Sequence, residues 1–201
     1  MDYLVTMTTR VPEGTAEQAV DDVRAREAAH SRELAARGHL LRLWRPPLQP
    51  GEWRTLGLFA AGDASELETV LASMPLRVWR TDQVTPLAVH PNDPARPQAG
   101  LRPGQQEFLT TFISAIPAGT PGAAVADARA REAQRAAELG QQERLLRLWQ
   151  LPAPGRALGL WRAADPAQLQ ALLRTLPLDP YQTVDTTPLT PHPSDPAAGP
   201  G

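Results

Sequence analysis

Apolar and polar residues alternate over several short stretches of the chain, and the longer stretches between them repeat apolar residues at helical spacing. Residues 2–9, rich in Tyr, Val, Thr and Met, predict a first strand. Residues 16–37 predict a long helix with a narrow apolar stripe, which Gly38 ends. The same reasoning predicts the rest of the first half: strands over 40–44 and 55–60, a helix over 64–73 and a strand over 81–89.

Residues that can cap a helix precede three of the predicted helices. Thr15, with Gln18 three residues later, has the spacing of a capping box, and so has Asp63 with Glu66. Asp165 stands at the same place before the last helix. These residues fix where we expect each helix to begin.

The pattern begins again after residue 105, so the chain contains two tandem copies of one unit. Arg24-Ala25-Arg26-Glu27-Ala28 recurs as Arg129-Ala130-Arg131-Glu132-Ala133, and Leu-Arg-Leu-Trp follows each at the same spacing. The second copy predicts strands over 107–114, 144–149, 157–161 and 183–190, with one helix ending near 140 and another beginning after 165. Segments 74–76 and 176–178 are expected to be loops.

Stretches rich in Pro, Gly and polar residues mark the boundaries of the copies. We expect repeat 1 over 1–92, a linker over 93–105, repeat 2 over 106–193 and a disordered tail over 194–201.

In each copy the order is strand, helix, strand, strand, helix, strand, which is typical of the ferredoxin-like, or split βαβ, arrangement. It predicts an antiparallel sheet with both helices on one face, and the other face must then be covered. The expected fold class is α+β, with two tandem ferredoxin-like (βαββαβ) domains whose sheets pack face to face as in dimeric α+β barrels.

Composition excludes several functions. The net charge is −2 and the arginines are spread along the chain, so nucleic acid is not an expected partner. All 20 basic residues are arginine, which excludes a Schiff-base lysine and a conventional P-loop. Without cysteine there is no disulfide or thiolate chemistry. No apolar run has the length of a membrane span and no signal peptide is recognisable, so we expect a soluble, cytoplasmic protein.

Tryptophan and histidine recur at equivalent positions of the two copies. Trp44 and Trp149 lie on predicted strands and are expected in the core. His90 and His192 each precede a proline after the last strand, without the neighbouring carboxylates of a metal site. We expect a surface or capping role for both histidines, and no metal.

The helix glutamate, the Leu-Trp-Arg strand, the Leu-Pro-Leu loop and the closing His-Pro together resemble the muconolactone Δ-isomerase family, in their order and spacing and over most of each copy. The resemblance implies the ferredoxin-like fold, ring-like decamers of chains half this length, and a cofactor-free proton shift that converts muconolactone to the 3-oxoadipate enol-lactone. A tandem duplication would look like two fused subunits. The resemblance therefore implies a homo-oligomer, with five chains in a ring.

The resemblance also implies site residues. Glu27 and Glu132 match the family's helix glutamate, and Arg24 and Arg129 stand where the family commonly has lysine. Arg45 matches the arginine of Leu-Trp-Arg.

The two copies keep different parts of the family pattern. The counterpart of Arg45 in the second copy is Gln150. The loop motif that ends in Pro-Tyr is retained only in the second copy, where it ends at Tyr181, while the first copy has Leu76-Arg77-Val78-Trp79. Arg45 and Tyr181 are expected to bind substrate, in one composite site or in two decaying ones.

An allylic proton shift in a small unsaturated lactone needs a base that also returns the proton, and a carboxylate with a raised pKa can do both. Arginine would bind the carboxylate of the lactone or of a related carboxylic acid. The alternative for the helix pair of arginine and glutamate is a solvated i, i+3 ion pair.

Two further functions remain open from the sequence. One is a non-catalytic ligand-binding or assembly module derived from the family, which predicts exposed glutamates and a pocket filled by apolar residues such as Leu56. The other, a cofactor-free monooxygenase-like protein, rests on fold analogy alone.

Overall fold

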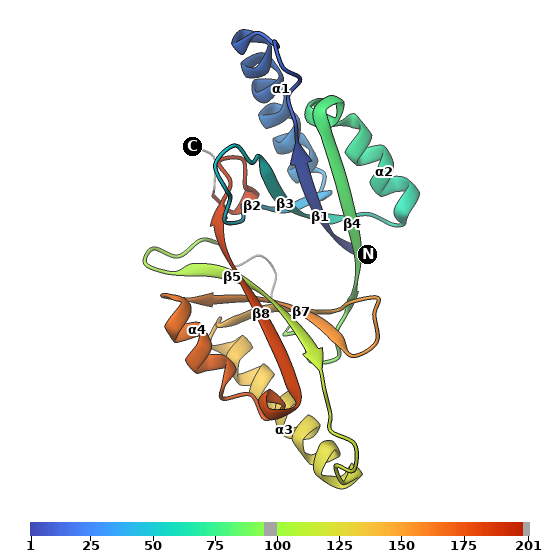
Figure 1. Ribbon diagram of the computed structural model, residues 1–201, viewed down its shortest axis with the longest axis vertical. Helices are drawn as coiled ribbons and strands as arrows, with labels where there is room; N and C mark the ends of the chain where they lie inside the picture. Colours follow the sequence, from blue (N-terminus) through green and yellow to red (C-terminus); the bar gives the residue numbers. More distant parts are fainter. Residues whose placement is uncertain (95–99, 199–201) are drawn as a thin grey trace. The chain divides into compact units, whose positions relative to one another are not determined.

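The computed structural model describes residues 1–94 and 100–198, and in this part of the chain eight strands and four α-helices follow one another in the predicted order (Figure 1). Contacts divide the chain into two units. Unit 1 is Met1–Leu87 with Thr190–Gly201, and unit 2 is Ala88–Leu189. Each unit is therefore one repeat that has exchanged its last residues for those of the other repeat.

Unit 1 is a four-stranded antiparallel sheet with two helices. Its elements are β1 Asp2–Thr9, α1 Glu17–Ala36, β2 Leu40–Arg45, β3 Arg54–Ala60, α2 Ala64–Ser73 and β4 Arg80–Val89. The strand order is β2-β3-β1-β4, with Val5 opposite both Gly57 and Val84. Thr190 and Pro191 pair with the end of β2, opposite Arg45 and Trp44.

Unit 2 repeats this arrangement. Its elements are β5 Gln106–Ser114, α3 Gly122–Gln141, β6 Leu145–Gln150, β7 Arg156–Ala163, α4 Pro166–Leu173 and β8 Gln182–Pro191. The strand order is β6-β7-β5-β8, again antiparallel. Ala88 and Val89, the last residues of β4, pair with Gln150 and Trp149 of β6.

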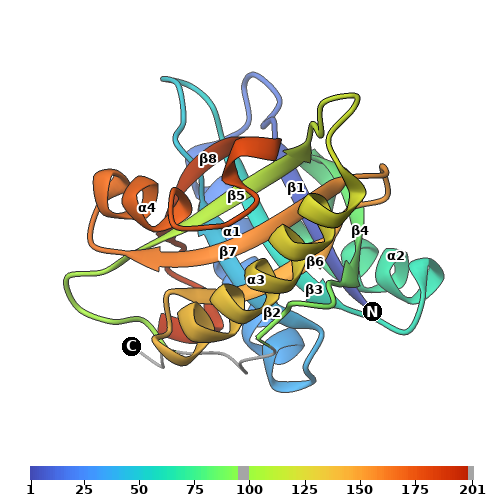
Figure 2. The same cartoon turned by 90° about the horizontal axis from the view of Figure 1, so that it is seen from below.

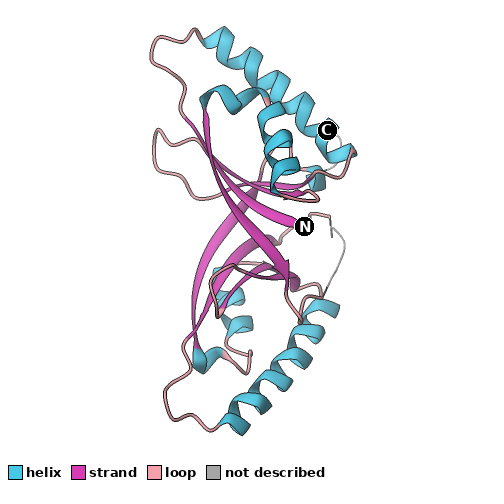
Figure 3. Cartoon of the chain, turned by 90° about the vertical axis from the view of Figure 1, so that its right-hand side faces the viewer, coloured by secondary structure: helices cyan, strands magenta, loops and turns pink. Residues whose placement is uncertain are grey.

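The helices of each unit cover one face of its sheet, as the ferredoxin-like order predicts (Figure 3). In unit 1, Val5 and Phe59 of the sheet belong to one buried apolar cluster with Leu34 of α1 and Leu67 and Leu71 of α2. The exposure of β1 alternates residue by residue, because successive side chains of a strand point to opposite faces.

Unit 2 has an equivalent core. Phe108 and Trp161 of its sheet cluster with Leu139 of α3 and Leu169 of α4, and α3 runs across the strands of this unit in Figure 2. Trp44 and Trp149 are each 1% exposed, which confirms that they are buried. Among the described residues, no helix is both long and apolar enough to cross a membrane.

Two of the three predicted helix caps are confirmed. Asp63 accepts a hydrogen bond from the Glu66 amide, and Asp165 accepts one from the Gln168 amide. The capping box at Thr15 is wrong, because the Thr15 hydroxyl donates to the Pro12 carbonyl instead, at 2.7 Å. Helix α1 begins after Ala16, which has no side-chain cap.

Both predicted loops continue into short 3₁₀ helices. The first spans Pro75–Trp79 and therefore includes two of the three residues predicted to be loop; the second spans Asp179–Tyr181. Proline occupies one of the first two positions of each, where its missing N–H leaves no hydrogen bond unmade.

The predicted linker and tail require correction, because a carboxylate in each is buried. Asp195 accepts hydrogen bonds from Arg42 and from the Leu43 amide, so residues 194–198 are ordered in unit 1 and end in a 3₁₀ helix. Asp93 makes the equivalent contacts with Arg147 and the Leu148 amide in unit 2. The rest of the predicted tail, 199–201, and part of the linker, 95–99, lie outside the described residues.

Candidate active site

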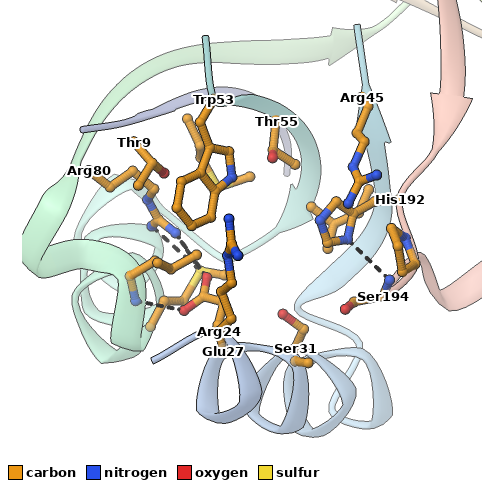
Figure 4. Close-up of a pocket in the computed structure, with 16 residues that line it drawn as sticks. Thr9, Arg24, Glu27, Ser31, Arg45, Trp53, Thr55, Arg80, His192 and Ser194 are labelled. Atoms are coloured by element: carbon orange, nitrogen blue, oxygen red, sulfur yellow. Dashed lines mark hydrogen bonds and ion pairs between the residues drawn. The ribbon is translucent and has the colours of Figure 1, made fainter. Parts of the chain in front are cut away.

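A cavity of about 390 Å³ opens in unit 1 between α1 and the sheet. Helix α1, strands β1 to β3, the 3₁₀ turn after α2 and the exchanged segment 192–194 all line it. Figure 4 shows its polar side chains, with Glu27 and Arg24 projecting from α1. Elements distant in sequence thus bring acidic, basic and aromatic groups to one place.

Glu27 is the buried acid of this cavity. Its side chain is 13% exposed. One carboxylate oxygen, Oε2, accepts a hydrogen bond from the Leu76 amide at 2.8 Å, and Oε1 lies 3.2 Å from Nη1 of Arg80. Burial raises the pKa of Glu27, while the Leu76 hydrogen bond and the Arg80 charge act in the opposite direction and leave a net increase.

Arg80 is the residue that orients Glu27, and the sequence reasoning missed it. Its guanidinium is almost fully buried and binds Asp82 through both Nε, at 2.7 Å, and Nη2, at 3.0 Å. Arg77 donates to the same carboxylate at 2.6 Å. A sequence signal was present, because residues two apart on a strand share a face, and Arg80 and Asp82 have this spacing at the start of β4.

The alternative of a solvated i, i+3 pair supposed that Arg24 contacts Glu27. Arg24 instead contacts Trp53 and Asp21. Its guanidinium carbon lies 4.5 Å from the centroid of the Trp53 ring, and its contact with Asp21 is long, at 3.4 Å, and exposed. An exposed pair of this kind contributes little to stability. The cationic head of Arg24 therefore remains accessible from the cavity that it lines.

Arg45 and His192 form another part of the lining (Figure 4). Arg45 is exposed and has no ion pair with any other residue in ranges 1–94 and 100–198. His192 accepts a hydrogen bond from the Ser194 amide through Nδ1, and its own amide donates to the Leu43 carbonyl. A surface or capping role was predicted for this histidine; the hydrogen bond from the Ser194 amide is of the capping kind, and its place in the cavity was not predicted.

The pKa of His192 is lowered to about 4, first by burial and then by the charge of Arg45, with Asp195 opposing both. Above pH 6.5 the ring is neutral in the folded and unfolded chain alike. Between pH 6.5 and about 4 the unfolded chain binds a proton that the folded chain does not, so the free energy of unfolding falls as pH decreases.

We therefore expect His192→Asn to reduce the loss of unfolding free energy between pH 7 and pH 4.5, since asparagine keeps an acceptor for the Ser194 amide without a titrating ring. Urea unfolding of both proteins at the two pH values measures this difference. An equal loss in wild type and variant would contradict it.

Unit 2 places Glu132 as unit 1 places Glu27. Its Oε2 accepts a hydrogen bond from the Leu178 amide at 2.9 Å. Burial raises the pKa of Glu132, and the nearby Asp179 raises it further. No arginine occupies the position equivalent to Arg80, because the second repeat has Gln182 there.

The six predicted site residues are thus distributed over the two units. Three of them, Glu27, Arg24 and Arg45, line the cavity of unit 1. Arg129 and Glu132 line two different cavities of unit 2. Tyr181 lines neither of these, and its backbone bonds Ala115 and Leu178. Among the described residues, no group of three or more His, Asp or Glu side chains is arranged to hold a metal ion.

Known proteins resemble this chain in sequence and in fold. The family model described as muconolactone delta-isomerase matches residues 1–93 and 106–195. Muconolactone Delta-isomerase of Cupriavidus pinatubonensis is 36% identical over 92 residues, which are 46% of this chain and 97% of that protein. Muconolactone Delta-isomerase 1 of Acinetobacter lwoffii is 30% identical over 92 residues, 46% and 93% of the two chains.

Among solved structures, a mutant chlorite dismutase from Candidatus Nitrospira defluvii matches with a TM-score of 0.60 at 10% identity, over 94% of this chain and 92% of the other. At this identity the likeness concerns the fold alone. The family model covers the chain in two successive segments, and each relative has the length of one segment. The chain therefore belongs to the muconolactone delta-isomerase family and carries its domain twice.

Proposed function

We propose that unit 1 is an isomerase that needs no cofactor and shifts a proton in muconolactone or a similar small unsaturated lactone. The observation that carries the proposal is the position of Glu27, largely buried, with a raised pKa, on a cavity that also presents two accessible arginines. Family membership supports isomerase chemistry in general.

Glu27 has the properties of a group that first accepts and then returns a proton. A carboxylate whose pKa is raised toward neutrality is a stronger base than an exposed one, and its conjugate acid still gives the proton back. The Leu76 amide and Arg80 hold its two oxygens, so the carboxylate keeps one orientation during both transfers.

Arg45 and Arg24 are the proposed binding residues for the substrate carboxylate. Both line the cavity, and within ranges 1–94 and 100–198 neither is neutralised by a close, buried acid. Arg80 has a different role, since its guanidinium already forms an ion pair with Asp82. The exposed arginines would fix the carboxylate arm while the lactone ring extends toward Glu27.

In the proposed reaction Glu27 takes the proton from the ring carbon that carries the carboxymethyl arm. The electron pair moves through the ring double bond into the carbonyl group, which gives a dienolate whose carbonyl oxygen bears most of the negative charge. Glu27 then returns the proton to the carbon next to the carbonyl, which leaves the double bond in its new place. No atom is gained or lost, and Glu27 ends the cycle ionised as it began.

Two observations favour this proposal over a non-catalytic module. That alternative predicts glutamates open to solvent and a pocket filled by Leu56, but Glu27 is 13% exposed and Leu56 is not among the residues that line the cavity. The homo-oligomeric ring of five chains implied by the resemblance stays a prediction.

Proton NMR of muconolactone mixed with the full chain in D₂O tests the proposal directly. We expect the enol-lactone signals to appear, with deuterium at the carbon next to the carbonyl in those turnovers in which the Glu27 proton exchanges with solvent before its return. Neither turnover nor exchange, from folded protein, would reject muconolactone as the substrate.

We expect Arg80→Gln, which gives unit 1 the residue of unit 2, to move the acid limb of the pH profile of kcat/KM to higher pH. The Arg80 charge lowers the pKa of Glu27, so its loss raises that pKa further, and the base form then requires a higher pH. Arg77→Gln is the matched control, because Arg77 shares Asp82 with Arg80 but has no bond to Glu27. The same shift in both variants, or none in either, would show that Arg80 does not act through Glu27.

A further inference from the structure

The larger cavity of unit 2, about 670 Å³, differs in chemistry from the cavity of unit 1. Two arginines, Arg129 of α3 and Arg156 of β7, belong to its lining, and none of the described residues that line it is an aspartate or a glutamate. The remaining polar lining includes Gln150 and Gln182, which replace Arg45 and Arg80 of unit 1. The lining formed by the described residues is therefore positively charged.

The two arginines are available to a ligand. Neither Arg129 nor Arg156 has an ion pair with another described residue, and both are exposed. Their counterparts in unit 1 both have an acidic neighbour, since Arg24 contacts Asp21 and Arg54 is 3.0 Å from Glu52. A pair of uncompensated guanidinium groups on one cavity favours a small anion, and a carboxylate matches the planar donor pattern of arginine.

The acid of unit 2 lies elsewhere. Glu132 lines an adjoining, smaller cavity of about 80 Å³, which shares six lining residues with the larger one: His90, Asn92, Phe112, Ala157, Leu178 and Gln182. The Leu178 amide lowers the pKa of Glu132 as the Leu76 amide lowers that of Glu27, but with Gln182 in place of Arg80 the further lowering by an arginine charge is missing. The group that would have to remove a proton thus lines the adjoining cavity and not the one that the two arginines line.

We infer that unit 2 binds a small carboxylate on Arg129 and Arg156 and does not isomerise it. The two repeats then have different tasks, and one chain binds two ligand molecules but converts one. The inference rests on the proposed function only for the choice of muconolactone as the ligand.

The test is a calorimetric titration of the full chain carrying Glu27→Gln with muconolactone, at low ionic strength and without other carboxylates in the buffer. We expect two molecules bound per chain, and one after Arg129→Gln and Arg156→Gln are added. The matched control adds Arg131→Gln and Arg174→Gln, which remove two exposed arginines of unit 2 outside the lining of both cavities, and should leave two. Unfolding curves verify that each protein is folded.

The outcomes separate the inference from the proposed function. No binding at all, or a stoichiometry that the Arg129 and Arg156 changes leave unaltered, would overturn the inference. Inorganic phosphate that fills the site while muconolactone does not would overturn its assignment to carboxylates. If the Glu27→Gln chain isomerises muconolactone, and adding Arg129→Gln and Arg156→Gln abolishes this activity, unit 2 is catalytic and that part of the inference is wrong. Two bound molecules without turnover by the wild type would instead reject the proposed function and leave the inference standing.

Discussion

Replacing Glu27 with glutamine is expected to lower kcat for muconolactone isomerisation by roughly 10²–10⁴-fold, the contribution that a positioned general acid or base makes. Glutamine has nearly the same volume, and its carbonyl oxygen can still accept the hydrogen bond from the Leu76 amide. Arg80 remains neutralised by Asp82. The substitution therefore removes the proton-carrying group while the surrounding contacts stay in place.

The rate is measured by NMR from the growth of the enol-lactone signals, and Glu132→Gln is the matched variant. It makes the same chemical change beside an equivalent amide, that of Leu178, so general effects of the substitution appear in both proteins. We expect Glu132→Gln to keep most of the wild-type rate, because its glutamate lies off the arginine-lined cavity of unit 2. A larger loss from Glu132→Gln than from Glu27→Gln would place the chemistry in the other unit.

Replacing Asp195 with alanine is expected to reduce the free energy of unfolding of unit 1 by about 3–5 kcal/mol, the usual cost of removing one partner of a buried ion pair. The Asp195 side chain is 0% exposed and that of Arg42 is 4% exposed, at a distance of 2.9 Å. Asp195 also accepts the Leu43 amide of β2. Water cannot readily replace the lost carboxylate at either group.

Asp93→Ala tests the equivalent contacts in unit 2, where the arginine partner is more exposed to solvent. Asp93 accepts from Arg147 and from the Leu148 amide, but the Arg147 side chain is 23% exposed, so a smaller loss is expected. Urea unfolding gives the free energies, and hydrogen exchange at the Leu43 and Leu148 amides localises the effect to one unit. Equal losses in the two variants would show that burial of the arginine does not set the size of the effect.

The fold could be predicted because it depends on local patterns. Alternation over β1 and the cap at Asp63 are properties of a few neighbouring residues, and the duplication shows each pattern a second time. The capping box at Thr15 failed because a hydroxyl that can cap a helix can equally close the preceding turn, as it does on the Pro12 carbonyl.

The candidate site was predictable where it repeats and hidden where it does not. Glu27 recurs as Glu132, but Arg80, 53 residues from its partner Glu27, is glutamine in the second repeat. Asp195 is 153 residues from Arg42 and stands in a segment whose Pro and Gly content is typical of disorder. Ion pairs between such distant residues leave no periodic signal.

The loop motif that ends at Tyr181 drew attention to a side chain, whereas the group of the loop that contacts the glutamate is a backbone amide. The loop contributes a backbone amide to the glutamate in both units, from Leu76 and from Leu178. A main-chain donor survives most side-chain substitutions nearby. The first repeat can therefore lose the Pro-Tyr pair and still hold Glu27.

The exchanged ends have a consequence for how the gene can change. His192 and its neighbours are encoded at the end of the second repeat but line the cavity of unit 1, and His90 is encoded in the first repeat but lines the cavities of unit 2. A recombination event that deletes either repeat would remove part of both sites. Selection for the cavity of unit 1 therefore retains the second repeat, even while residues such as Gln150 and Gln182 diverge. The second repeat can then acquire a different role, because its deletion would also damage the cavity of unit 1.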